Sequence, residues 1–593
     1  MPALPILIIT LCVFTISYRF YSAFLASKVF VLDHNRKTPA HTHRDGQNYY
    51  PMSKWVLFGH HFAAISGAGP LIGPVLAAQF GFLPGLLWIV VGVVLGGAVQ
   101  DFVILVASTR RQGRSLAEIA GDEIGKPAGM ACAIAVLFIV IVALGGLGFV
   151  VVNALAESAW GTFTIGASIP IAMAMGLYIF GKHHGSHQAV RAASIVGVTL
   201  LFSAVIFGRF VPDIPWLNSL FLLDKKSIIV AIGIYGFFAS VLPVWLLLAP
   251  RDYLSSFMKL GTIFLLIAGI CVVNPRLQFP ALTPYIHGGG PIVPGKVWPF
   301  CFITIMCGAI SGFHALVSSG TTPKMISDEC HARSIGYGCM LLEALVAVVC
   351  LLAVCSMHPG DYYAINTSPA VFQNLNLAPV NLDHLTQEVG EKSLIGRTGG
   401  AVSLAVGMAQ IFSAIPGLDK FMKYWYHFAI MFEALFILTT IDAGTRIARF
   451  ILQELLGKIY APFKRPDWLP GNIMTSLAVV FSWGYLIWNA SISTIWPMFG
   501  IANQLLAVIA LSIGTTILIS MNKRKYAWTT LLPMLFVMVT TLTAAYEMVK
   551  NHYWPKIATP FTVQLNIFLI VVMVSSSLFI VASAATKWAR SKA

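Results

Sequence analysis

The chain carries, in its second long apolar segment, the run Ile65-Ser66-Gly67-Ala68-Gly69-Pro70-Leu71-Ile72-Gly73-Pro74. Five of the eight residues from Gly67 to Pro74 are glycine or proline. A proline lacks the N–H that an α-helix needs, and a glycine admits non-helical dihedral angles. Backbone groups freed in lipid are costly, so a break is tolerated only where protein or a polar cavity satisfies them. We predict a helix broken in mid-membrane, with a simple proline kink as the alternative. The residues predicted to bind cargo there are Ser66, Gly67, Ala68, Gly69 and Pro70.

The composition is that of a membrane protein. Of 593 residues, 57% are hydrophobic and 10% are charged, with a mean hydropathy of +0.80, whereas soluble domains carry about 25% charged residues. A membrane helix needs about 20 mostly apolar residues, and about fifteen segments meet that test. They lie near residues 4–26, 62–80, 82–107, 130–153, 160–181, 192–210, 228–250, 259–273, 299–320, 336–357, 424–441, 470–489, 495–520, 527–546 and 563–586. We predict an all-α polytopic membrane bundle of about 15–17 transmembrane helices in a single domain, residues 1–593.

Lys and Arg collect in loops between these segments, as the residues that set membrane topology do. The clusters lie near residues 28–54, 110–126, 446–465, 523–525 and 587–592. Such loops stay cytoplasmic, so the C-terminus is predicted in the cytoplasm and the N-terminus on the far side. The net charge of +15 follows this distribution, and we therefore predict no nucleic-acid partner.

The topology between residues 400 and 442 is left open by the charges. The acidic segment 358–400 is predicted to lie outside, and the loop after residue 442 inside, so an odd number of crossings must separate them. The apolar stretch from Ala401 to Ile415 is short. It fits either a re-entrant piece or part of an extra pair of crossings.

A second interruption is predicted five helices after the first, in the span from Tyr235 to Trp245. By the charge pattern this span runs opposite to the first broken one. Two antiparallel broken helices, five apart, are typical of transporters built from inverted repeats. We predict such a core over about residues 55–360, with additional helices over about 400–593. Ser240, Pro243 and Trp245 are the cargo-binding candidates of the second break.

Hydroxyl side chains crowd the end of the ninth predicted helix. In an inverted-repeat core that begins at the second helix, this span commonly offers hydroxyl oxygens to a cation opposite the first break. The candidates are Ser318, Ser319, Thr321 and Thr322. Alternatively, these side chains bond the carbonyls of their own helix.

Three acidic residues fall inside apolar spans: Asp101, Glu343 and Glu433. Ionisable groups inside a membrane are costly and are by default functional hypotheses. These three carboxyls are our candidates for a proton relay, with H⁺ as the coupling ion and Na⁺ as the alternative. A structural role beside Arg, Lys or a helix N-terminus is the competing interpretation.

Metal and enzyme chemistry are disfavoured. Histidines gather at loop-facing ends of spans, at His60, His61, His183, His184 and His187, without clustered cysteines or paired carboxylates. We predict no metal site and no cofactor. GxSxG, P-loop and HExxH patterns are not convincingly present, so we predict no enzyme.

Several segments together resemble one known family. They are Tyr18-Arg19-Phe20-Tyr21, Leu57-Phe58-Gly59-His60-His61-Phe62-Ala63, Gly67-Ala68-Gly69-Pro70, Gly97-Ala98-Val99-Gln100-Asp101-Phe102, Leu242-Pro243-Val244-Trp245-Leu246-Leu247-Leu248-Ala249-Pro250-Arg251-Asp252-Tyr253, Ser318-Ser319-Gly320-Thr321-Thr322-Pro323-Lys324, Asp442-Ala443-Gly444-Thr445-Arg446 and Trp496-Pro497-Met498-Phe499-Gly500-Ile501-Ala502-Asn503-Gln504-Leu505. The chain resembles the carbon starvation protein A (CstA) family over most of its length.

This resemblance implies a multi-pass transporter of the bacterial inner membrane, related to the amino-acid/polyamine/organocation superfamily and active in carbon starvation. It implies a symporter that imports peptides or pyruvate. A fold does not identify a substrate, so both remain expectations. A nutrient sensor would normally append a soluble output domain, and none is visible. A membrane enzyme acting on lipid-linked substrates would gather its acidic and histidine residues at one interface, whereas here the acids are scattered through spans.

Overall fold

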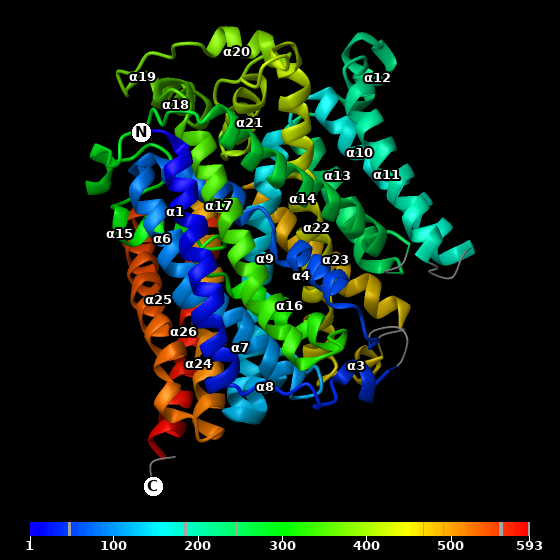
Figure 1. Ribbon diagram of the computed structural model, residues 1–593, viewed down its shortest axis with the longest axis vertical. Helices are drawn as coiled ribbons and strands as arrows, with labels where there is room; N and C mark the ends of the chain where they lie inside the picture. Colours follow the sequence, from blue (N-terminus) through cyan, green and yellow to red (C-terminus); the bar gives the residue numbers. More distant parts are fainter. Residues whose placement is uncertain are drawn as a thin grey trace. The chain divides into compact units, whose positions relative to one another are not determined.

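The computed structural model describes residues 1–593 except 45–48, 183–186, 244–245, 466–467, 490, 557–560 and 591–593. The described residues form helices and connecting segments and no β-strand (Figure 1). Eleven of their helices are long and apolar enough to cross a membrane, or twelve if one bent pair counts as a span. The all-α polytopic fold class is therefore confirmed, but the described residues give eleven or twelve candidate spans where about 15–17 were predicted. Of the fifteen predicted segments, eleven coincide with these long helices and one with the bent pair; the other three are short or broken.

The chain forms two compact units, and each is described by itself. Unit 1 comprises residues 1–5, 144–281 and 349–495, and unit 2 comprises residues 6–143, 282–348 and 496–593. The division falls within four helices, α1 (Ala3–Ile16), α9 (Lys126–Leu155), α17 (Cys339–Cys355) and α24 (Ile492–Ser520).

Unit 2 contains two interrupted spans, α4 (Lys54–Ile65) with α5 (Gly69–Ala77) and α15 (Val297–Thr304) with α16 (Gly312–Gly320), and a set of continuous helices around them. The N-terminal span of the chain, Ala3–Val29, is continuous and joins α1 (Ala3–Ile16) to α2 (Ser22–Phe24) through π-helical turns. The remaining helices are α3 (Pro39–Thr42), α6 (Phe82–Gly92), α7 (Ala98–Thr109), α8 (Leu116–Glu123), α25 (Trp528–Glu547) and α26 (Phe561–Arg590), with short turns η8 (Thr322–Lys324), η9 (Glu329–His331) and η10 (Arg333–Gly338).

Unit 1 is organised around one long helix, α22 (Met422–Leu456). Its other helices are α10 (Ala159–Gly176), α11 (His187–Gly208), α12 (Pro215–Phe221), α13 (Lys225–Val241), α14 (Leu248–Val273), α18 (Pro359–Asn366), α19 (Pro369–Gln373), α20 (Leu382–Val389), α21 (Ala401–Ser413) and α23 (Leu469–Trp488). The stretch whose topology the sequence left open is α21, one of two shorter apolar helices.

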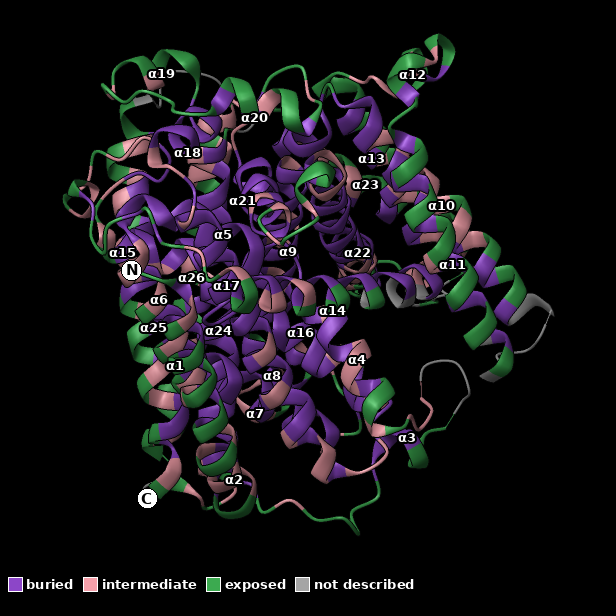
Figure 2. Cartoon of the chain, turned by 45° about the horizontal axis from the view of Figure 1, so that its top comes forward, coloured by how far each residue is buried: buried purple, intermediate pink, exposed green. Residues whose placement is uncertain are grey.

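Burial separates core helices from outer ones in each unit (Figure 2). The most apolar window of α24 is wholly buried, and that of α22 is 94% buried. In α11 the corresponding share is 39%, and exposed side chains such as Ile195, Phe202 and Ile206 are apolar. A helix that is apolar and buried on all sides belongs to a core, whereas an exposed apolar face suits lipid.

The predicted break in the second segment is present. Helix α4 ends at Ile65, α5 starts at Gly69, and the two are bent by 45°. Ser66 leaves the helical region with ψ of 87°, and Pro70 occupies the first turn of α5, where a missing N–H costs nothing. The glycine-proline run therefore ends one helix and starts another, as its composition requires.

A third interruption, which the sequence did not predict, lies in the segment 299–320. This segment was predicted to be one helix, and that prediction was wrong. Helix α15 ends at Thr304 and α16 begins at Gly312, and the residues between them are not helical. The local signals for this break were Gly308, Ser311 and Gly312.

The segment 228–250 also differs from a single helix. Helix α13 ends at Val241, Leu242 is extended with ψ of 153°, and α14 starts at Leu248. The predicted interruption near Pro243 is thus present. Its direction relative to the first break stays a prediction.

Backbone contact between α5 and the end of α15 yields a stability prediction. A Cβ added at Gly73 would lie 2.6 Å from the carbonyl oxygen of Thr304, whereas a Cβ at Gly59 would meet nothing within 4 Å. Gly73→Ala should therefore destabilise the fold by about 1–3 kcal/mol through overpacking. Gly59→Ala, in the helix of the same broken span, should be neutral or stabilising by up to about 1 kcal/mol. Thermal unfolding of the two purified variants in detergent measures the difference. Equal melting temperatures would contradict this contact.

Candidate functional site

Two broken spans meet in unit 2. A Cβ added at Gly69 would collide with the side chain of Cys307, and one at Gly73 would press on Thr304 and Ile305. The start of α5 therefore lies against the non-helical segment between α15 and α16. Glycine is needed at both positions because backbone approaches backbone or Cβ there. We call this region, Ser66–Gly73 with Thr304–Ser311, the crossing.

Protein side chains satisfy the backbone carbonyls freed at the end of α15. The indole Nε1 of Trp88 donates to the carbonyls of Phe302 (3.1 Å) and Ile305 (3.0 Å). Trp496 Nε1 donates to the carbonyl of Thr304 (3.2 Å), and Gln504 Nε2 donates to that of Phe302 (2.8 Å). These bonds meet the requirement that a break in the membrane be satisfied by protein.

Two further side chains hold the start of α16. Asn503 Oδ1 accepts the Phe313 N–H at 2.8 Å, and Asn503 Nδ2 donates to Ser311 Oγ at 3.0 Å. Gln100 Nε2 donates to the carbonyl of Ser311 at 2.5 Å. The N-terminus of α16 is thus capped by an amide from α24.

A charged cluster lies beside the crossing. His314, in the first turn of α16, places Nδ1 at 2.9 Å from Asp101 Oδ2 on α7 and Nε2 at 3.2 Å from Glu343 Oε2 on α17. All three side chains are completely buried. Gln100 Nε2 also donates to Asp101 Oδ1 at 3.2 Å. We call Asp101, His314 and Glu343 the carboxylate–histidine cluster.

Close helix packing holds this cluster together. A Cβ at Gly97, one turn before Asp101, would collide with the carbonyl of Ala309. A Cβ at Gly308 would collide with Ala347, one turn after Glu343 on α17. Small residues allow such approach between membrane helices. The non-helical segment between α15 and α16 is therefore clamped between the two helices that carry the carboxylates.

The four predicted hydroxyls have different surroundings. Ser319 Oγ donates to the carbonyl of Ala315, and Thr321 Oγ1 donates to that of Val317, so these two follow the alternative of bonding their own helix. Thr322 Oγ1 lies 2.7 Å from Nδ1 of the buried His61. Ser318 Oγ, one turn from His314, is buried without a hydrogen-bond partner among the described residues.

Two of the three predicted relay acids lie in one cluster. Asp101 and Glu343 both contact His314 in unit 2. Glu433 lies on α22 in unit 1, where it is completely buried and neither carboxyl oxygen has a hydrogen-bond partner among the described residues. The structure thus connects two of the three.

Unit 1 contains a separate buried ion pair. Arg251 Nη1 of α14 lies 3.3 Å from Asp442 Oδ2 of α22, and both side chains are completely buried. Tyr235 of α13 donates its hydroxyl to the same carboxylate, and its ring lies 4.4 Å from the Arg251 guanidinium. Three helices are joined by this pair.

Arginines of α22 also satisfy the end of α13. Arg446 donates to the carbonyls of Ala239 (2.7 Å) and Leu242 (2.5 Å), and Arg449 donates to that of Ser240 (2.9 Å). Cations at a helix C-terminus complete its unpaired carbonyls.

The predicted cargo residues of the second break differ in how deeply they are buried. Ser240 is fully buried, with its hydroxyl 2.9 Å from that of Ser476, and Pro243 is exposed. Trp245 lies outside the described residues.

Several residues of these clusters were missed from the sequence. His314 stands alone in an apolar span, and that isolation was the available signal. Arg251, Asp442 and Asn503 lie within the quoted family segments, but nothing local shows their partners. His183 and His184 lie outside the described residues.

Interrupted spans that surround buried ionisable groups in an apolar helical bundle define a class of protein, the polytopic membrane transporter. The family model "Carbon starvation protein CstA" matches residues 2–544. The chain belongs to this family. This result confirms the resemblance.

Curated relatives are similar over most of their length. A "Peptide transporter CstA" of Bacillus subtilis is 48% identical, covering 100% of this chain and 98% of the relative. The Escherichia coli proteins named "Peptide transporter CstA" and "Pyruvate/proton symporter BtsT" are 46% and 44% identical, covering 92% and 91% of this chain and 81% and 80% of the relatives. These names confirm the interpretation as a transporter rather than an enzyme.

Solved structures of a manganese transporter from Eremococcus coleocola show a weaker similarity. One is 12% identical with a TM-score of 0.42, and the match covers 90% of this chain and 96% of that structure. A similarity at this level carries no inference about mechanism.

The ion pair in unit 1 yields a prediction that separates structural from transport roles. Arg251→Met leaves the Asp442 charge buried without its cation and should cost about 3–5 kcal/mol of stability. Arg251→Met with Asp442→Leu removes both charges and should regain most of that loss. Thermal unfolding in detergent is the measurement. A double variant no more stable than the single one would contradict a role based on charge pairing.

Proposed function

We propose that this protein is a proton-coupled symporter that imports a small carboxylate-bearing solute, a peptide or pyruvate, across the bacterial inner membrane. The names of the relatives support both solute classes, and one of them is named a proton symporter. The family description supports a role during carbon starvation. The observation that carries the coupling is the carboxylate–histidine cluster beside the crossing.

The number of ionisable groups in this cluster favours proton transfer. With both carboxylates ionised and His314 protonated, the buried cluster has one net negative charge. Isolated buried charge is strongly disfavoured in a low-dielectric interior. Binding one further proton neutralises the cluster, so its protonation state has a large energetic effect on the helices α7, α16 and α17 that carry it.

The hydroxyls around the cluster leave Na⁺ as the alternative coupling ion. Hard cations such as Na⁺ are held by several oxygen ligands. Ser319 and Thr321 donate to helix carbonyls, which leaves the lone pairs of their oxygens available, and Thr322 is paired with His61. The preference for a proton therefore rests on the carboxylate–histidine cluster.

The start of α5 is our candidate for the cargo carboxylate. Helix N-termini favour anions, by about 0.3–1 kcal/mol at exposed sites and up to about 2 kcal/mol in partly buried ones. The N-cap of α5 is Ala68, whose side chain cannot accept a hydrogen bond from the first turn. By contrast, α16 has its first-turn N–H capped by Asn503. Residues Ser66–Pro70 therefore keep their assignment as cargo ligands in this proposal.

The orientation follows from the positive loops, with the C-terminus in the cytoplasm and the N-terminus on the far side. A nutrient sensor with the same fold would bind the solute without moving it. Uptake into vesicles discriminates between the two.

Proton coupling predicts a defined defect for the cluster. Asp101→Asn and Glu343→Gln each replace one carboxyl by a neutral amide that cannot bind or release a proton. Uptake driven by a proton gradient should therefore fall to background, while solute exchange at equal pH should persist. Labelled pyruvate and a labelled dipeptide in proteoliposomes, with and without a gradient, provide the measurement. Glu388→Gln, which alters an exposed His384–Glu388 pair in unit 1, is the matched control and should transport normally. Absence of gradient-dependent uptake of both solutes by the unaltered protein would refute the coupling.

The crossing predicts a transport defect with a specific rescue. Gly69→Leu or Gly69→Ala should abolish uptake while leaving membrane insertion intact, because the new Cβ collides with Cys307. Adding Cys307→Gly to Gly69→Ala vacates that space and should restore part of the uptake. Normal uptake by Gly69→Ala alone would remove this contact from the mechanism.

A further inference from the structure

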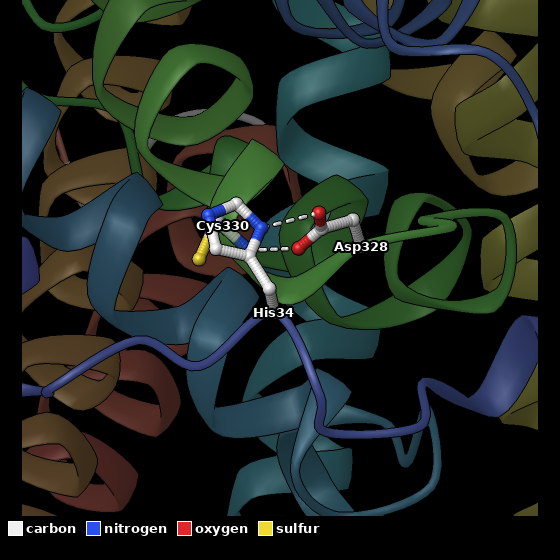
Figure 3. A group of neighbouring side chains, drawn as sticks. All are labelled: His34, Asp328 and Cys330. Carbon is white, nitrogen blue, oxygen red and sulfur yellow. Dashed lines mark hydrogen bonds and ion pairs between the residues drawn. The ribbon is translucent and has the colours of Figure 1, made fainter.

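A cluster of potential metal ligands lies in unit 2, outside the carboxylate–histidine cluster (Figure 3). His34 comes from the loop after the first span, and Asp328 and Cys330 come from the turn around η9. One nitrogen, one carboxylate oxygen and one sulfur all lie within 4.8 Å of one another. His34 Nδ1 and Asp328 Oδ2 are 2.7 Å apart although the two residues are 294 positions apart in the chain.

The segments that carry these ligands are fixed to each other by other bonds. The buried Glu329 carboxylate accepts hydrogen bonds from Arg36 Nη1 at 2.8 Å and from the Asp33 N–H at 3.4 Å, and it also pairs with Arg110. On the turn itself, the Cys330 N–H donates to Asp328 Oδ1 at 2.8 Å. The ligands are therefore brought together without any ion, which lowers the entropic cost of binding one.

We propose that His34, Asp328 and Cys330 form a zinc-binding site. An imidazole, a carboxylate and a thiolate are the three side-chain types that Zn²⁺ binds, at about 2.0–2.3 Å, whereas Mg²⁺ and Ca²⁺ prefer oxygen ligands alone. Tetrahedral bonds of that length place donor atoms roughly 3.3–3.7 Å apart. The 2.7 Å distance between His34 Nδ1 and Asp328 Oδ2 therefore has to lengthen by about 0.6–1 Å, and the other separations have to shorten by about 1.5 Å or less. Three protein ligands leave a fourth position for water, and the His34 side chain is 75% exposed.

Polar and charged groups surround the Asp328 carboxylate. Its Oδ1 accepts the Cys330 N–H at 2.8 Å, and its Oδ2 lies 2.7 Å from His34 Nδ1. The neighbouring cations Arg36 and Arg110 both pair with the Glu329 carboxylate, whose single negative charge offsets one of their two positive charges.

The simplest competing interpretation is a surface His–Asp ion pair beside an unrelated thiol. Such pairs contribute little and occur without a metal. The chain contains a matched example in unit 1, His384 and Glu388, with a nitrogen–oxygen distance of 3.3 Å. The two interpretations differ in whether the Cys330 sulfur takes part.

The test uses the purified full-length protein in detergent, first stripped with a chelator and then titrated with Co²⁺ and Zn²⁺. We expect one Zn²⁺ per chain by equilibrium dialysis and a cobalt–thiolate charge-transfer band that Zn²⁺ abolishes. Cys330→Ser should remove the band, and His34→Ala and Asp328→Asn should weaken Zn²⁺ binding by about tenfold or more. His384→Ala should leave both unchanged. No band in the unaltered protein, or a band and stoichiometry that survive Cys330→Ser, would overturn the proposal.

A second measurement covers a Cys330→Ser variant that fails to fold. In the unaltered protein, saturating Zn²⁺ should slow maleimide labelling of Cys330, as mapped by mass spectrometry. Cys271, which is exposed and lies near the end of α14, serves as an internal control and should label at an unchanged rate. Labelling of Cys330 at the same rate with and without Zn²⁺ would refute thiolate ligation.

Discussion

Backbone groups inside a membrane must be satisfied by the protein itself, and the crossing in unit 2 depends on how this is done. The carbonyls freed where α15 ends accept hydrogen bonds from Trp88, Trp496 and Gln504. These bonds allow the span to break without exposing polar groups to lipid. The start of α5 then packs against the break because Gly69 and Gly73 have no Cβ. Cargo is therefore not needed to satisfy the α15 carbonyls, and its candidate place is the uncapped start of α5.

The two buried groups of ionisable side chains differ in their net charge when every member is ionised. Arg251 and Asp442 form a pair that is neutral when both are ionised, and Tyr235 adds a hydrogen bond to it. Asp101, His314 and Glu343 are three groups, and full ionisation leaves one uncompensated negative charge. A neutral pair gains nothing from a proton, whereas the three-group cluster becomes neutral by binding one. Unit 1 thus has the pair suited to holding helices together, and unit 2 has the cluster suited to carrying a proton.

Much of the fold could be predicted from local patterns. The glycine-proline run from Gly67 to Pro74 specified a break because proline and glycine act on their own backbone. Asp101 and Glu343 stood out because any carboxyl in an apolar span does. The break before Gly312 was missed because its carbonyls are satisfied by residues about 200 positions away, such as Trp88 and Trp496. Likewise, the contact of His314 with Asp101 spans 213 positions and leaves no periodic trace in the sequence.

The two breaks that the sequence presented as equivalent differ in charge and in capping. At the second, the carbonyl end of α13 is covered by the guanidinium groups of Arg446 and Arg449, so its partial negative charge is compensated. At the first, the amide end of α5 begins at Ala68 with no polar side chain of its own. A helix end carries only about half an elementary charge, whereas Arg446 and Arg449 carry two positive charges, so a carboxylate is attracted to both breaks. The break in unit 2 differs in lying beside the cluster whose net charge a proton can cancel.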